Sequence, residues 1–141
     1  MLASRRSVVV LVLGAFAFCA TLSTAAQSAG TLSQTAKSSD GAGVRVIVKP
    51  KVIGGGPVWE FEVTMDTHTR PLDDDLTKSA VLVDENGRRY AAAGWQGDPP
   101  GSHHRKGILR FPAPTEPTKF FEVQMQDVGG VDRRVFQWSE K

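Results

Sequence analysis

Apolar and polar residues alternate over most of the chain from residue 43 onward, with the period of two that is typical of β-strands. The clearest example covers residues 58–66, where apolar side chains alternate with polar or charged ones: Trp59, Phe61, Val63 and Met65 against Glu60, Glu62, Thr64 and Asp66. On a strand this pattern places one apolar face inward and one charged face toward water. We therefore predict a half-buried strand here.

The same period predicts seven short strands, at residues 44–49, 58–66, 79–84, 88–93, 107–111, 119–127 and 133–138. Seven short antiparallel strands in about a hundred residues predict an all-β fold, a single immunoglobulin-like sandwich over residues 43–141. The cysteine pair of antibody domains is absent from this segment. A small open barrel is the alternative. Trp59 and Trp138 are expected in the core.

Two glycine-containing dipeptides predict hairpin turns. Asn86-Gly87 favours a two-residue type I′ turn, because both central positions need a positive φ. That turn predicts three cross-strand pairs: Glu85 with Arg88, Asp84 with Arg89 and Val83 with Tyr90.

Gly129-Gly130 can form a similar turn, which pairs Val123 with Phe136 and Phe121 with Trp138. It also sets Asp127 opposite Asp132, an unfavourable like-charge pair that would favour a longer loop.

The N-terminal region has the features of an export signal. Arg5 and Arg6 precede an apolar run at residues 8–18, and small residues end at Ala26, where we expect cleavage. Residues 1–26 are thus predicted to be a signal peptide, and residues 27–42, rich in Ser, Thr, Gly and Ala, a flexible linker. The protein is therefore expected in the periplasm or outside the cell. The general and twin-arginine export routes both remain open, as does an uncleaved anchor.

Removing the signal changes the charge and the cysteine content. The chain has 17 basic and 15 acidic residues, and Arg5 and Arg6 leave with the signal, so the mature chain is neutral. Cys19, its single cysteine, leaves as well. A neutral chain lacks the basic stripe that nucleic-acid binding needs, so no nucleic-acid partner is expected. A cysteine-free chain has no disulfides, and its core alone must hold the fold.

Two connections are longer than hairpin turns and contain or adjoin all three histidines: residues 68–79 and 94–107. Loops on a rigid scaffold commonly carry binding residues. We therefore predict a monomeric, non-catalytic module that binds an envelope or extracellular protein through these loops. The candidate contact residues are Trp95, Asp98, His103, His104 and Arg105.

A metal site is the first alternative. Asp66 and His68 are two positions apart at a strand end, so both side chains leave the same side, and His103 and His104 would complete a set suited to zinc or copper(II). The sequence does not show whether the histidines converge. Solvated histidines are the competing interpretation, and no other cofactor is expected. The run 73–75 lacks the spacing of a calcium loop and reads as a loop or the start of a helical turn through residues 76–79.

Carbohydrate binding on Trp95 is the second alternative, because an exposed indole can stack on a sugar. The competing interpretation is that Trp95 folds back against the sandwich. Catalysis has little support, because the mature chain has no thiol, no G-x-S-x-G and no H-E-x-x-H motif.

The stretches VWEFEVTMDTHT and GWQGDPPGSHHRKGILRF resemble small uncharacterised exported bacterial proteins with an immunoglobulin-like β-sandwich domain. The resemblance covers roughly residues 44–138. It implies a β-sandwich fold and an envelope location, and no activity or ligand.

Overall fold

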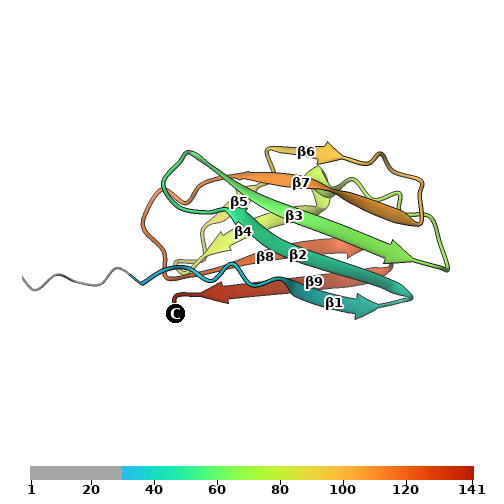
Figure 1. Ribbon diagram of the computed structural model, residues 1–141, viewed down its shortest axis with the longest axis horizontal. Helices are drawn as coiled ribbons and strands as arrows, with labels where there is room; N and C mark the ends of the chain where they lie inside the picture. The colour runs from blue at the N-terminus through green and yellow to red at the C-terminus, as the bar shows by residue number, and fades with distance from the viewer. Residues whose placement is uncertain (1–29) are drawn as a thin grey trace, which may run out of the picture.

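The structure is a computed structural model that describes residues 30–141, in which two antiparallel sheets pack face to face (Figure 1). The first sheet has the strand order β1 (Lys37–Gly41), β2 (Val44–Val52), β3 (Val58–Thr67), β7 (His104–Pro112) and β6 (Gly94–Gly97). The second has the order β5 (Arg89–Ala91), β4 (Ala80–Asp84), β8 (Phe120–Val128) and β9 (Val131–Ser139). The predicted signal peptide and the first residues of the predicted linker lie outside the described residues. Within residues 30–141, no helix is long and apolar enough to cross a membrane.

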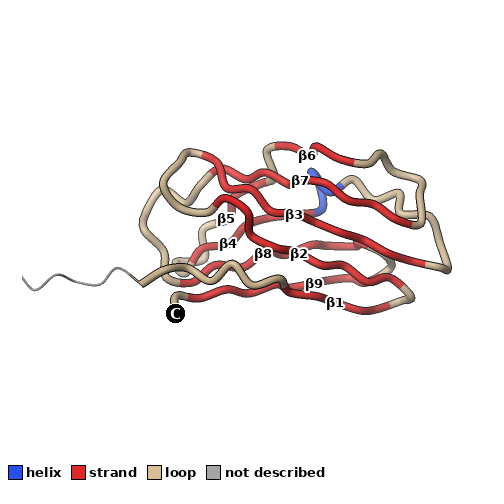
Figure 2. The backbone as a smooth tube through the Cα atoms, in the orientation of Figure 1, coloured by secondary structure: helices blue, strands red, loops and turns tan. Residues whose placement is uncertain are grey.

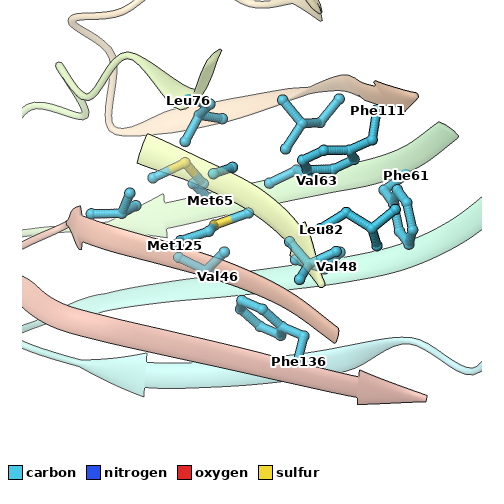
Figure 3. Close-up of a cluster of buried hydrophobic side chains, with 14 of the residues drawn as sticks. Val46, Val48, Phe61, Val63, Met65, Leu76, Leu82, Phe111, Met125 and Phe136 are labelled. Carbon is cyan, nitrogen blue, oxygen red and sulfur yellow. The ribbon is translucent and has the colours of Figure 1, made fainter. Parts of the chain in front are cut away.

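The core lies between the inner faces of the two sheets (Figure 3). On β3 the predicted alternation is confirmed, because Trp59, Phe61, Val63 and Met65 are all buried. Trp138 on β9 is buried as predicted and stacks on Phe121 of β8, with ring centroids 5.2 Å apart. Burying aromatic and aliphatic side chains in this layer is the main stabilising contribution to a domain without disulfides.

The described chain has nine strands rather than the predicted seven (Figure 2). The seven predicted strands are present with shifted ends, and β1 and β6 are additional. β1 occupies residues 37–41 and therefore lies within the segment for which the sequence predicts a flexible linker. Its sequence, KSSDG, has no apolar alternation, and its order comes from backbone pairing with β2.

A buried arginine on β9 also holds β1 in place. Arg134 is only 1% exposed. Its guanidinium donates to the backbone oxygen of Ser39 (2.8 Å), Gly41 (3.2 Å) and Val44 (3.3 Å), and to that of Val128 (3.1 Å). Burial lowers the pKa of Arg134 from its ordinary value, which the nearby carboxylates partly offset. Arg134 thereby ties the N-terminal strand to the second sheet.

The hairpin at Asn86-Gly87 has a different register from the predicted one. Leu82 pairs with Tyr90 and Val83 with Arg89, so the loop has three residues and the predicted pairs are wrong by one position. Gly87 has a φ of 77°, whereas Asn86 is outside the left-handed region. The Asp84 carboxylate explains the difference, because its Oδ1 accepts from the backbone N–H groups at 86 and 88 and stabilises the wider turn.

The hairpin between β8 and β9 has the predicted register. Phe121 pairs with Trp138 and Val123 with Phe136. Both glycines of the turn have positive φ, 60° at Gly129 and 73° at Gly130, as a two-residue type I′ turn requires. The like charges at 127 and 132 therefore do not lengthen the loop.

Candidate functional site

All three histidines lie in or beside the end of β3 and the start of β7, and these strand ends are at the right of Figure 1. Four connections meet there: the β1–β2 turn at residues 42–43, the segment 68–75 after β3, the β6–β7 loop at 98–103 and the β8–β9 turn at 129–130. We call these segments, together with the strand residues that adjoin them, the histidine end. The two segments chosen from sequence, 68–79 and 94–107, both contribute to it. They do so because β3 and β6 end at this side of the first sheet and β7 begins there.

The antiparallel pairing of β3 with β7 brings together three of the four predicted metal ligands. Asp66 is directly opposite His104 in the register. The Asp66 Oδ1 contacts the Nδ1 of His104. The ring of His68 lies edge-on to that of His104, with centroids 6.3 Å apart. The side chains of Asp66 and His104 are 38% and 70% exposed, so the cluster is open to solvent.

His103 has a different position in this arrangement. Its backbone oxygen accepts from the N–H of Thr67 at 2.9 Å, which extends the β3–β7 ladder by one bond. Within residues 30–141, no hydrogen bond or ring contact joins the His103 side chain to Asp66, His68 or His104. His103 is exposed. Among residues 30–141, no group of three or more His, Cys, Asp or Glu side chains is arranged to hold a metal ion.

The two loops are joined to each other by their backbones. The N–H of Leu72 donates to the oxygen of Ser102 at 3.0 Å, and the N–H of Gly101 donates to the oxygen of Leu72 at 3.2 Å. The Leu72 side chain is fully buried in the core and anchors the first loop. Further along, Asp75 caps the helical turn α1 (Leu76–Ser79), as one of the two sequence interpretations expected. The two loops therefore form one continuous surface.

Arg105 does not belong to the exposed contact set that the sequence predicted. It is only 3% exposed, because β7 begins at residue 104 and the alternation of this strand turns Arg105 inward. Its guanidinium donates to the backbone oxygen of Asp98 (3.1 Å) and to that of Asp74 (2.5 Å), one in each loop. Arg105 therefore links the two loops from inside and is not an exposed loop residue.

Trp95 is on β6, an element that the sequence analysis treated as loop. It is half-buried and packs against the core, with its indole N–H donating to the backbone oxygen of Asp98 at 3.0 Å. The Arg105 guanidinium lies 5.2 Å from its ring centroid, a cation–π contact. This arrangement agrees with the interpretation that Trp95 folds back against the sandwich.

Asp98 is exposed, but its polar atoms are engaged within the loop. Its Oδ2 accepts from the backbone N–H of Lys106 at 2.8 Å, and its backbone N–H donates to the oxygen of the same residue at 2.9 Å. Together with the bonds from Trp95 and Arg105, these contacts make Asp98 the residue that closes the base of the loop. Residues 98–104 are all exposed, and Asp98 differs from the rest in that its carboxylate is already bonded within the loop.

Charged side chains form a row on the outer face beside the histidines. The register places Asp40, Arg45, Asp66 and His104 next to one another across four strands. Arg45 pairs with Asp40 at 2.7 Å, and this hydrogen bond raises the pKa of Arg45 above its ordinary value. A hollow of about 400 Å³ is lined by His68 and by three members of this row, Asp40, Arg45 and Asp66. A second hollow, of about 490 Å³, lies between the 98–102 segment and His104.

The comparisons with known proteins add little to this geometry. No protein-family model matches the sequence, and no curated protein matches it. Among solved structures, the chain is similar to a DUF4426 family protein from Pseudomonas aeruginosa PAO1, with a TM-score of 0.45 and 10% sequence identity. The similarity covers 75% of this chain and 94% of that chain. A likeness at this level carries no argument about function or site residues.

Proposed function

We propose that this chain is an exported, non-catalytic immunoglobulin-like module that binds a protein partner through the histidine end. The observation that carries the proposal is the joining of segments 68–75 and 98–103 by the Leu72–Ser102 and Gly101–Leu72 hydrogen bonds. A surface that is already ordered loses little conformational entropy when a partner binds. Pro99 and Pro100 limit the backbone freedom of the second segment further.

The strand order supports the immunoglobulin-like part of the proposal. An immunoglobulin domain has strands A, B, E and D in one sheet and C, F and G in the other. When the letters are assigned in chain order from β2, the first sheet runs A, B, E, D through β2, β3, β7 and β6. The second sheet runs C′, C, F, G through β5, β4, β8 and β9. β1 is then an N-terminal addition at the edge of the first sheet.

The composition of the surface supports a protein partner over an anionic polymer. The exposed residues of the histidine end carry both signs of charge: they include two arginines and two aspartates, namely Arg45, Arg70, Asp40 and Asp73. Electrostatic complementarity between mixed charges gives specificity toward one partner, whereas nucleic acid requires a basic surface. Exposed histidines and prolines add hydrogen-bonding and apolar contact area.

The partner surface is tested by photo-crosslinking in the native host. A photo-reactive amino acid at position 103, in the middle of the histidine end, is expected to give a discrete crosslinked adduct. The matched control is position 51, because Lys51 is also exposed and lies near the other end of β2. Adding Pro100→Lys to the variant that carries the photo-reactive amino acid at position 103 should remove the adduct and leave the thermal unfolding curve unchanged. Adducts of equal yield at positions 51 and 103 would contradict the proposal.

Export and cleavage of the chain are tested separately from partner binding. The proposal expects the periplasmic or secreted fraction to contain a chain that begins at Gln27, which intact-mass spectrometry of the fractionated protein detects. A full-length chain that stays in the cytoplasmic fraction would contradict export without bearing on the histidine end.

A further inference from the structure

Two imidazoles meet at the histidine end although 35 residues separate them in the chain. His68 follows the last residue of β3, and His104 is the first residue of β7. The pairing of these strands brings the rings edge-on at a centroid separation of 6.3 Å. Both residues are exposed, and hollows of about 400 Å³ and 490 Å³ adjoin them. A small ligand can therefore reach both rings from solvent.

Asp66 determines which nitrogen of His104 is free. Its carboxylate contacts Nδ1 of the imidazole, and an ionised carboxylate can only accept hydrogen bonds. The neutral imidazole then carries its proton on Nδ1 and its lone pair on Nε2. Histidines that bind metal ions in proteins are commonly held in this way, with one ring nitrogen donating to a carboxylate and the other bound to the metal.

We propose that His68 and His104 together bind a divalent transition-metal ion, with Cu(II) held more tightly than Zn(II), and that Asp66 is a positioning residue for His104. The site goes beyond the proposed partner surface, because ion binding needs no partner.

The separation of the rings fits this site. An ion bound to an imidazole lies about 2.0–2.1 Å from the nitrogen, hence roughly 3 Å from the ring centroid. Half of the observed 6.3 Å separation is close to this distance. An angular geometry, tetrahedral or square-planar, needs the rings to approach by roughly 1–2 Å, which a rotation of the exposed His68 side chain supplies.

The surroundings set the strength and the selectivity of the site. Two protein nitrogens bind the ion, and water from the adjoining hollows completes its coordination. Arg45, which is opposite Asp66 in the register, places a positive charge nearby and opposes the ion. The site is therefore of moderate affinity. Imidazole nitrogens favour Cu(II) over Zn(II) in the ordinary order of divalent stabilities.

Calorimetric titration of the untagged full chain with CuCl₂ and ZnCl₂ tests the site. We expect one Cu(II) ion per chain with a Kd tighter than about 10 μM, and weaker binding of Zn(II). His68→Ala and His104→Ala should each weaken Cu(II) binding at least about 10-fold. His103→Ala is the matched control, because it removes an exposed neighbouring imidazole, and it should leave the Kd unchanged. Thermal unfolding of each variant verifies that it is folded.

Two spectroscopic measurements separate the roles of the residues. Electron paramagnetic resonance of the Cu(II) complex should show coupling to two imidazole nitrogens in the wild type and to one in His68→Ala. Nitrogen-15 NMR of the metal-free protein at alkaline pH should show His104 protonated on Nδ1. Asp66→Ala should shift the proton to Nε2 and weaken Cu(II) binding by about 10-fold.

Three results would overturn the proposal. The first is the absence of saturable Cu(II) binding tighter than about 10 μM. The second is a loss of Cu(II) affinity in His103→Ala as large as in His104→Ala. The third is a wild-type His104 protonated on Nε2, which removes the role of Asp66. None of them bears on the crosslinking result at position 103, so the metal site and the partner surface fail independently.

Discussion

Replacing Arg105 tests whether the histidine end is held together from inside. Arg105→Met keeps the aliphatic stem and removes the guanidinium, and with it the hydrogen bonds to the backbone oxygens of Asp98 and Asp74 and the contact with Trp95. Asp98 keeps the indole N–H as a donor, whereas the Asp74 oxygen loses the bond from Arg105. The two loops therefore lose the side chain that binds both.

The magnitude follows from these contacts. A hydrogen bond from a charged donor contributes about 1.5–3 kcal/mol, and a cation–π contact about 0.5–2 kcal/mol. The cost of burying the charge is recovered in the variant and offsets part of this sum. We expect Arg105→Met to lower the free energy of unfolding by about 2–3 kcal/mol, which corresponds to a fall in Tm of roughly 10 °C or more for a domain of this size.

Urea denaturation of the variant and of a neighbouring control measures the effect. Lys106→Met is the control, because this side chain is 61% exposed and pairs with Glu62 only at the surface, at 3.5 Å. An exposed ion pair contributes less than about 1 kcal/mol. Hydrogen exchange at the Leu72 and Gly101 amides should accelerate only in Arg105→Met. Unfolding of the two variants at the same urea concentration would show that Arg105 does not hold the two loops together.

Two further substitutions test the corrections to the fold. Arg134→Leu should lower the free energy of unfolding in urea by about 3 kcal/mol and expose the β1 amides to hydrogen exchange, because several backbone oxygens lose a charged donor. The control Arg133→Leu replaces an exposed neighbour and should change the free energy of unfolding little. Protected β1 amides in Arg134→Leu would contradict the role of this residue. Gly87→Ala should lower the free energy of unfolding by at least about 1 kcal/mol, because Gly87 has a positive φ. Asn86→Ala should change the free energy of unfolding little, because Asn86 is outside the left-handed region. Equal costs at 86 and 87 would instead indicate the two-residue type I′ turn.

The alternation of apolar residues was sufficient to predict the inward faces of the long strands. On β3 and on the β8–β9 hairpin, side-chain direction depends on the local period of two, and Gly129-Gly130 fixes the register by turn geometry alone. The same period also predicts that Arg105 faces inward. Counting back by twos from Phe111 through Leu109 and Gly107 reaches Arg105 on the inward face. The burial of the Arg105 side chain could therefore have been predicted from the sequence.

The strand β1 and the histidine pair were decided by tertiary structure. β1 has a polar sequence without a period, and its order depends on β2 and on Arg134, which lies 93 residues from Gly41. The sequence could place Asp66 and His68 on one side of a strand, but whether His103 or His104 joined them depended on the β3–β7 register. A one-residue shift in that register would have reversed the choice, because successive side chains of a strand face opposite sides of the sheet. The sequence by itself thus determined which residues face the core, since that depends on neighbours in the chain, and tertiary pairing decided which distant residues meet.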